Sequence, residues 1–374
     1  MTGPGDSRRQ TPLAGQLARE IATSGPIGVD TYIRRCLSDP QHGYYTTRSG
    51  IGRDGDFTTA PEISQAFGEL IGLWAAVVWQ QMGAPAQVNL VEFGPGRGEL
   101  MSDALRAGRV LPGFLQAADL HLCEINPTFR RLQAEKLEAS GMGHAATWHD
   151  AWPDLAARPT IIIANEFLDT MPGTQWRCDR GGAWQEIRVG VDAKGQLDFI
   201  SRSAEPPFLD DPAVPPAPDP EAVLSWVDTT ELTQALSVQG AAAPLAALFI
   251  DYGHVMTTWG DTLQAVRGHQ PEHPLCSPGE ADLSLAVDFA AFQRAIEATG
   301  LAVDGPVTQA EYLGQLGIAE RASKLMAANP ARANEIESAV FRLMAAPGMG
   351  TRFHAIAVRS TTLDALPGFA AAPL

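Results

Sequence analysis

Cysteine is scarce in this sequence, and the few cysteines lie far apart. The chain has four in 374 residues, with no C-x-x-C pair and no histidine at the spacing of a zinc ligand set. A disulfide framework and a structural zinc site are therefore excluded, and a reducing compartment fits best. The four residues are Cys36, Cys123, Cys178 and Cys276.

Long apolar runs are also missing. The longest, residues 70–79, is about half of the ~20 residues that a membrane-spanning helix needs, and polar residues bound it on both sides. The first ten residues carry glycine, proline and arginine in place of the apolar stretch of a secretory signal. We therefore expect neither a membrane span nor a secretion signal.

Positive charge is in short supply. The chain has 27 Lys+Arg against 43 Asp+Glu, which gives a net charge of −16. A surface of this sign repels polyphosphates, so a general nucleic-acid binder is excluded. The hydrophobic fraction of 45% is ordinary for a globular protein, and the length predicts about two domains.

The first 83 residues predict a helical N-terminal region. Helical patterns cover residues 13–24 and 29–37, and each is followed by a glycine or proline signal. Thr59-Ala60-Pro61-Glu62 has the form of a capping box, with Thr59 as N-cap and Glu62 three residues later. This motif predicts one continuous helix from Thr59 to about Met82.

After Gly83 the pattern changes to short apolar strands that alternate with helices, which is typical of a parallel α/β sheet. Most of the strands are continuous apolar runs, as strands buried on both faces should be. We expect a core made of residues 84–170, 245–305 and 351–360. Residues 171–244, with a hairpin over 174–191 and a proline-rich exposed connection, and the helical residues 306–350 would be inserted cap segments. The predicted strands cover residues 88–93, 119–124, 145–148, 160–164, 246–251, 301–304 and 352–359.

The strongest local signal is a glycine loop between a strand and a helix, with glycines at Gly94, Gly96 and Gly98. Glycines let the backbone pass close to a ligand, and the following helix offers unpaired N–H donors. The spacing G-x-G-x-G differs from the dinucleotide fingerprint, whose third glycine or alanine would fall at Glu99. With Glu92 two residues ahead, the loop resembles the S-adenosylmethionine loop of class I methyltransferases. That resemblance implies that the glycines admit the methionine part and that Glu92 faces its ammonium group; the alternative is a tight turn without a ligand.

Acidic residues also follow the next strands. Glu124 ends the second predicted strand, where nucleotide-binding sheets hold ribose hydroxyls, and Asp150 follows the third, where class I enzymes often hold adenine. Asn165, Glu166 and Asp169 end the fourth strand and could hold a cationic or hydrogen-bonding acceptor. Each has a plainer interpretation as a strand end, a turn or a helix cap.

Other chemistries find little support. Prolines in residues 267–274 bar the helix that would present two histidines to a metal, so we reject a metal site. No G-x-S-x-G elbow occurs, which leaves a hydrolase without a visible nucleophile. A tyrosine and a glycine follow Asp251 at the end of the fifth strand, as a weaker copy of the same edge pattern.

Several segments, in order, resemble one family of proteins, the MidA family. They are Gly43-Tyr44-Tyr45, the run from Gly52 to Ser64, the glycine loop, residues 164–169, Asp251-Tyr252-Gly253, Arg267-Gly268-His269 and residues 278–282. The resemblance spans residues 20–360 and implies a Rossmann-like class I methyltransferase fold with a seven-strand sheet. Leu168 and Met171-Pro172-Gly173 depart from the usual pattern after the fourth strand, in residues that affect packing more than charge.

The resemblance also implies the activity. Members of this family are S-adenosyl-L-methionine-dependent methyltransferases, and the mitochondrial ones are complex I assembly factors that symmetrically dimethylate an arginine of a core subunit. For an arginine acceptor, Glu166, with Asp169, Asn165 or Asp56, would hold the guanidinium. A bacterial member would be cytoplasmic and a eukaryotic one would lie in the mitochondrial matrix. We expect a protein substrate and carry a homodimer as a hypothesis. The alternatives are a non-catalytic assembly chaperone that keeps the cofactor as a ligand, and a small-molecule methyltransferase.

Overall fold

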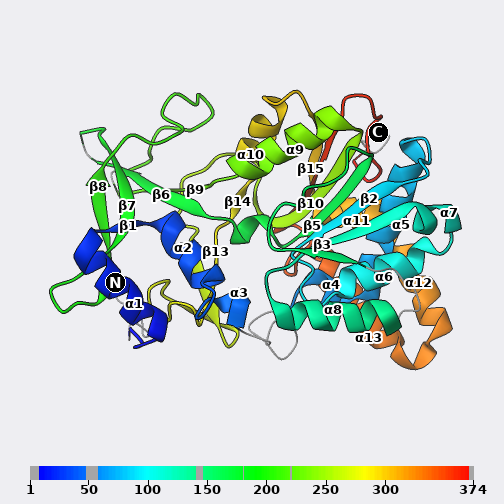
Figure 1. The fold of residues 1–374 in the computed structure, drawn as a ribbon, viewed down its shortest axis with the longest axis horizontal. Helices are drawn as coiled ribbons and strands as arrows, with labels where there is room; N and C mark the ends of the chain where they lie inside the picture. Colours follow the sequence, from blue (N-terminus) through cyan, green and yellow to red (C-terminus); the bar gives the residue numbers. More distant parts are fainter. Residues whose placement is uncertain (1–7, 48–57, 140–145, 180, 220, 370–374) are drawn as a thin grey trace.

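The computed structural model describes residues 8–47, 58–139, 146–179, 181–219 and 221–369 of the chain. A large mixed sheet lies at its centre, with the strand order β15-β16-β10-β5-β2-β3-β4 (Figure 1). All neighbours pair in parallel except β16, which is antiparallel to both β10 and β15. The predicted seven-strand α/β sheet is confirmed. Its strands are β2 (Val88–Phe93), β3 (Ala118–Cys123), β4 (Thr147–His149), β5 (Thr160–Asn165), β10 (Leu245–His254), β15 (Ala302–Thr308) and β16 (Phe353–Arg359), and the short β14 (Val287–Asp288) pairs with the end of β10.

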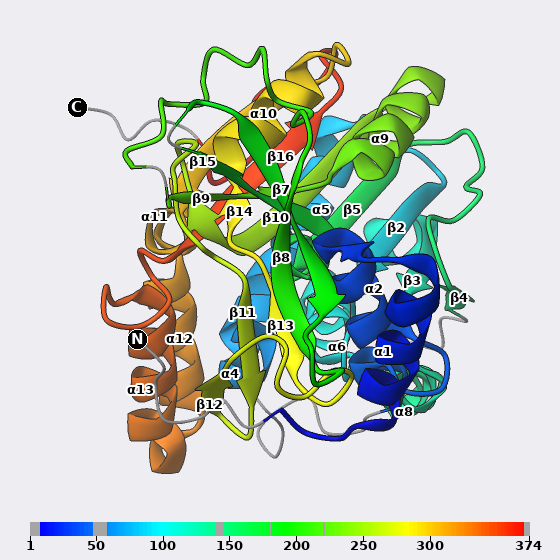
Figure 2. The same cartoon turned by 90° about the vertical axis from the view of Figure 1, so that its left-hand side faces the viewer.

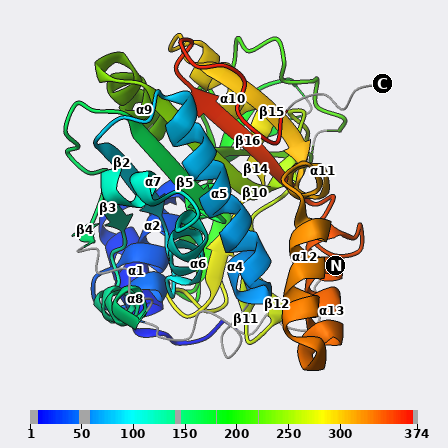
Figure 3. The same cartoon turned by 90° about the vertical axis from the view of Figure 1, so that its right-hand side faces the viewer.

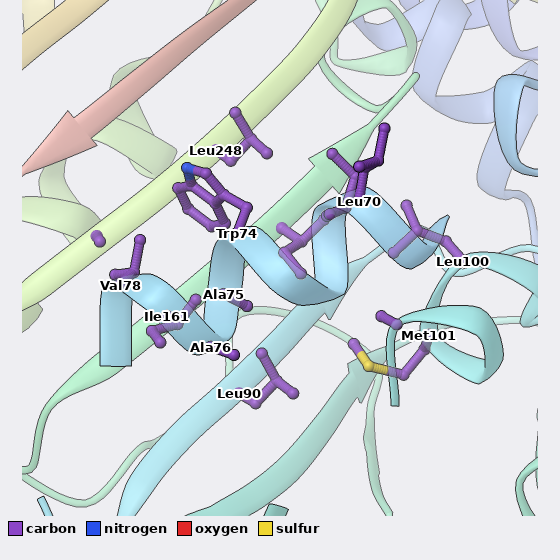
Figure 4. Close-up of a cluster of buried hydrophobic side chains, with 14 of the residues drawn as sticks. Leu70, Trp74, Ala75, Ala76, Val78, Leu90, Leu100, Met101, Ile161 and Leu248 are labelled. Atoms are coloured by element: carbon purple, nitrogen blue, oxygen red, sulfur yellow. The ribbon is translucent and has the colours of Figure 1, made fainter. Parts of the chain in front are cut away.

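Helices bury both faces of this sheet. Successive strand residues point to opposite faces, so Leu90 packs with the cluster under α5 and α6 while Val91 packs with the cluster that α9 and α10 cover. Figure 4 shows the first cluster, in which Trp74 of α5 lies beside Leu248 of β10. Because both faces are buried, the strands are apolar without alternation. The helices are α5 (Gln65–Gln81), α6 (Glu99–Gly108), α7 (Pro112–Ala117), α8 (Pro127–Ala139), α9 (Thr230–Ala242) and α10 (Phe289–Glu297).

The N-terminal helices pack on a second, five-stranded sheet (Figure 2). Leu13 and Leu17 of α1 share one buried cluster with Val189 of β7 and Leu283 of β13. The expected hairpin is confirmed as the antiparallel pair β6 and β7, but β1, β8 and β9 were not predicted. These elements are α1 (Pro12–Ser24), β1 (Ile27–Gly28), α2 (Val29–Ser38), α3 (Tyr44–Thr47), β6 (Gly173–Cys178), β7 (Trp184–Val191), β8 (Leu197–Ser203) and β9 (Val223–Val227), with a three-stranded sheet of β11 (Gln264–Arg267), β12 (Gln270–Glu272) and β13 (Asp282–Ser284).

The single helix expected from Thr59 to Met82 is wrong, because the chain breaks at Ser64. That residue is extended, at φ −151° and ψ 126°, between α4 (Ala60–Ile63) and α5. The Thr59 side chain caps nothing. The first helical N–H, that of Ala60, donates instead to Glu166 Oε1 at 2.9 Å, and the next residue is a proline with no N–H. The N–H of Glu62, which a capping box would pair with the Thr59 side chain, donates to the Thr59 carbonyl at 3.1 Å, so Glu166 holds the start of α4 through a different N–H.

Most of residues 309–344 form helices beside the sheet, as the pattern predicts. Figure 3 shows α12 and α13 alongside α4 and α5. The carboxylate of Glu69 on α5 is buried and pairs with Arg106 of α6 at 3.0 Å and with Arg321 of α12 at 2.6 Å. These helices are α11 (Gln309–Gln315), α12 (Ile318–Ala328) and α13 (Ala333–Met344), and two 3₁₀ turns, η1 (Leu168–Thr170) and η2 (Pro330–Arg332), complete the elements. Within the described ranges, none of the helices has the length and apolar character needed to span a bilayer.

Candidate active site

A cavity of about 370 Å³ lies at the carboxyl ends of β2, β3 and β5. Parallel strands bring the loops that follow them to the same edge of a sheet, and open α/β sheets bind ligands there. Leu37 and Tyr45 of the N-terminal region also line the cavity, and α4 contributes Glu62. Residues far apart in the sequence thus line one cavity.

The glycine loop lines the cavity through Gly94 and Gly96, while Gly98 does not line it. Gly94, Gly96 and Gly98 have φ of 62°, 51° and 81°, in the left-handed region that residues with a Cβ avoid. A Cβ on Gly98 would lie 3.1 Å from the side chain of Gln133, whereas one on Gly96 would meet nothing within 4 Å. Position 96 therefore favours glycine because of its backbone conformation and not because of crowding, and the space beside it is open to a ligand.

Glu92 is the most deeply buried acid of the cavity wall, at 3% exposure on β2. Its Oε2 atom has no hydrogen-bond partner. Burial, followed by the nearby charge of Glu124, raises the pKa of Glu92 to about 8. A buried carboxylate without a cation is costly, so the geometry favours a positively charged ligand group at this point.

Glu124 ends β3 beside the glycine loop. One of its oxygens accepts from the N–H of Asn126 at 2.7 Å, and the other accepts from Gln133 Nε2 at 3.3 Å. Burial raises the pKa of Glu124 to about 7 despite these hydrogen bonds. Asp150 also lines the cavity, but it is exposed and forms an ion pair with Arg130. The two acids lie on the wall where the sequence predicts the nucleoside.

Glu166 and Asn165 line the cavity at the end of β5. Glu166 Oε1 accepts from the N–H of Ala60 at 2.9 Å and from Asn165 Nδ2 at 3.1 Å. The side chain is partly accessible, yet loss of hydration in the cavity raises the pKa of Glu166 to about 7. The strand before Glu166, β5, pairs with β2, which leads into the glycine loop, so one cavity contains both predicted groups of residues.

The other two predicted acceptor residues differ from this pattern. Asp169 does not line the cavity; it is buried behind the wall, where burial and the charge of Asp251 hold its pKa well above the ordinary range. Asp56 lies outside the described residues. Glu166 and Asn165 are therefore the predicted acceptor residues that the structure brings into the cavity.

The structure adds wall residues that the sequence reasoning missed. The ring of Phe93 lies 5.3 Å from those of Trp152 and Phe167, and all three line the cavity. Tyr45 lines it too, and its hydroxyl donates to Asp282 at 2.7 Å. The Gly-Tyr-Tyr motif was a signal for Tyr45. Nothing in the sequence marked Trp152, because its neighbours carry no recognisable pattern.

These residues fit S-adenosyl-L-methionine. Its ammonium and sulfonium cations suit a wall that carries the unpartnered carboxylate of Glu92, and its adenine suits the aromatic side chains. The glycine loop can approach it through backbone N–H groups. Among the described residues, no group of three or more histidine, cysteine, aspartate or glutamate side chains could hold a metal ion.

Comparison with known proteins supports the same cofactor. Residues 70–307 match the model of a family of S-adenosyl-L-methionine-dependent methyltransferases. A crystal structure from Burkholderia thailandensis, bound to S-adenosyl-homocysteine, superposes with a TM-score of 0.83 over 97% of both chains at 26% identity. A native structure from the same organism gives 0.81 over 98% of both chains at 27% identity.

The similar curated proteins are mitochondrial and are named protein arginine methyltransferase NDUFAF7. The homolog from Drosophila melanogaster is 33% identical, over 92% of this chain and 84% of its own length. The protein from Danio rerio is 33% identical over 92% and 86%, and the human protein is 31% identical over 93% and 83%. With the glycine loop, the seven-strand sheet and the acidic cavity, these similarities show that the chain belongs to the MidA family of S-adenosyl-L-methionine-dependent methyltransferases.

Proposed function

We propose that the methyl acceptor is an arginine side chain of a protein. The observation that carries this proposal is the charge of the cavity wall. Its described lining carries six carboxylates, Glu62, Glu92, Glu99, Glu124, Asp150 and Glu166, against one guanidinium, that of Arg97. A wall of this sign attracts a cation and disfavours an anionic acceptor. The names of the relatives support arginine as that cation.

Glu166 would hold the guanidinium. Its Oε1 already accepts two hydrogen bonds, and these fix the side chain at the cavity wall. The Oε2 atom of a side chain fixed in this way can accept an N–H from the guanidinium and so orient one of its nitrogens. Asn165 Oδ1, which is buried without a partner, adds an acceptor beside it. We propose that these two residues aim the nitrogen and that Asp169, buried behind the wall, does not contact the acceptor.

The cofactor supplies a methyl group on a sulfonium, which is activated for transfer. During transfer a nitrogen–carbon bond forms, the carbon–sulfur bond breaks, and the nitrogen gives up a proton. Glu166 is placed to localise the positive charge on the far nitrogens and to take that proton. Orientation of this kind can supply effective molarities of ~10⁵ M or more. Symmetric dimethylation would require the second terminal nitrogen to take the same place.

We further propose, from the family resemblance, that the acceptor protein is a core subunit of respiratory complex I or its bacterial counterpart. The family relation and the mitochondrial location of the relatives support this proposal. The acting compartment would then be the mitochondrial matrix in a eukaryote and the cytoplasm in a bacterium. The acidic cavity favours a protein whose target arginine stands in a basic patch.

The substrate for the test is an extract of source cells from which the gene of this protein has been deleted, because its acceptor proteins are not yet methylated. We expect the purified protein, given S-adenosyl-L-methionine with a tritiated methyl group, to label a protein whose hydrolysate contains symmetric dimethylarginine. Glu166→Gln should lower the labelling at least tenfold, and the exposed control Glu135→Gln should not. Label in methyl-lysine or in small molecules would refute the arginine proposal, and an absence of label would favour the chaperone.

A further inference from the structure

The turn that presents Glu166 is strained. Glu166 N–H still follows the strand ladder and donates to the carbonyl of Ile250 at 2.8 Å. Its φ of 53° then turns the chain out of the strand. This left-handed conformation is unfavourable for a residue with a Cβ. The following 3₁₀ turn, η1, has no side-chain cap from Phe167, the residue in the N-cap position.

The cap comes from the neighbouring strand. Asp251, 1% exposed on β10, uses Oδ2 to accept from the N–H of Phe167 at 3.0 Å and from the N–H of Asp169 at 3.2 Å. Its Oδ1 accepts from the N–H of Tyr252 at 2.9 Å. Hydrogen bonds to a charged group are stronger than those between neutral groups. The pair to Oδ2 therefore stabilises the strained turn after Glu166.

This arrangement extends to the cavity. The backbone of the turn sets the direction in which the Glu166 side chain leaves it, and that side chain reaches the N–H of Ala60 at 2.9 Å. Asp251 is not part of the cavity wall; it holds the turn through hydrogen bonds, and its charge also interacts with that of Glu166. We propose that Asp251 is a positioning residue of this methyltransferase, which caps the turn after β5 and thereby aims Glu166 into the cavity. This inference rests on the proposed role of Glu166 toward the acceptor.

Asp251→Asn tests the inference at constant side-chain size. An amide has one acceptor oxygen, so it cannot serve both the N–H of Tyr252 and the two N–H groups of the turn. In the full-length protein we expect amide hydrogen exchange at Phe167, Asp169 and Ala60 to become at least tenfold faster than in the wild type. The affinity for S-adenosyl-homocysteine should change by less than about threefold, since Asp251 lies behind the acceptor side. Labelling of the gene-deletion extract should fall at least tenfold.

Asp288→Asn is the matched control. Asp288 is also a buried aspartate at a strand end, and its Oδ1 caps α10 by accepting from the N–H of Ala291 at 2.9 Å. We expect this variant to leave the exchange of Ala60 and the labelling unchanged. If Asp251→Asn leaves both unchanged, or speeds exchange equally throughout the core, the inference is wrong. Labelling that survives Glu166→Gln would refute the acceptor role of Glu166, and exchange at Ala60 would still decide whether Asp251 aims that side chain.

Discussion

Binding of S-adenosyl-L-methionine should release protons, chiefly from Glu92. Burial raises the pKa of this side chain to about 8, so about nine-tenths of the molecules carry the proton at pH 7 before binding. A cationic ligand group beside the carboxylate favours its charged form and lowers the pKa. Glu124, whose pKa is raised to about 7, can add about half a proton. Release of roughly 0.9 to 1.4 protons is therefore expected, and affinity should rise with pH between about 6 and 8.

The same group affects the free energy of unfolding. A carboxyl whose folded pKa is raised adds stability that is fully present below its unfolded pKa, 4.5, and that is lost as pH rises through about 8. Compared with acid pH, the free energy of unfolding is therefore lower by at most about 3 kcal/mol at pH 7 and by about 1 kcal/mol at pH 5. Glu92→Gln cannot ionise, so the ligand-free variant should melt up to ~4 °C higher than the wild type at pH 7, for a chain of this length.

Titration calorimetry in buffers of different ionisation enthalpy measures the protons released, and calorimetric melting at pH 5 and pH 7 measures the stability. Glu92→Gln should release about half a proton or less and bind the cofactor ~10- to 100-fold more weakly, the loss of one charge-assisted contact. Asp103→Asn is the control, since burial raises the pKa of Asp103 to about 6 away from the cavity. Unchanged affinity and proton release in Glu92→Gln would refute the placement of the cation.

Three further substitutions test the loop, the aromatic wall and the buried ion pairs. Gly96→Val should weaken cofactor binding at least 100-fold by calorimetry, because valine disfavours a φ of 51° and fills the approach to the loop. The control Gly195→Val, in a turn at φ 74°, should bind the cofactor normally. Equal affinities of the two variants would exclude the loop as the binding site. Trp152→Ala should weaken binding of S-adenosyl-homocysteine by about 1 kcal/mol, roughly fivefold, if its ring contacts adenine, and an unchanged affinity would remove it from the site. Glu69→Ala should lower the free energy of unfolding in urea by about 1.5–3 kcal/mol, since Arg321 loses its buried partner and Arg106 keeps only Asp103. Glu335→Ala in an exposed pair should cost under about 1 kcal/mol, and similar losses in both variants would contradict the importance of burial.

Much of the site followed from the order of residues along the chain. Glu92, Glu124 and Glu166 each stand at or near the end of a predicted strand, and parallel strands place such ends together. The cavity joins all three. The prediction needed no knowledge of distances, because strand direction alone brings those side chains to one edge.

Predictions from local sequence patterns were wrong where a backbone N–H group pairs with a side chain that is distant in the sequence. Thr59 and Glu62 have the spacing of a capping box, but Glu166 takes the first N–H of α4 and the helix breaks at Ser64. Asp251 looked like a weak copy of the other strand ends, and the structure shows that it caps a turn 82 to 84 residues earlier in the chain. Sequence spacing cannot predict such contacts, since they depend on which strands become neighbours.

The sequence by itself determined the sheet, the glycine loop and the negative sign of the site. These depend on apolar runs, on backbone conformations open chiefly to glycine, and on formal charge, which are properties of neighbouring residues. Only the tertiary structure shows that Tyr45 lines the cavity and that Asp169 lies behind its wall. It also shows that Glu92 is buried while Asp150 is exposed to water. Burial is the physical reason, because a carboxylate's hydration and pKa depend on everything packed around it in space.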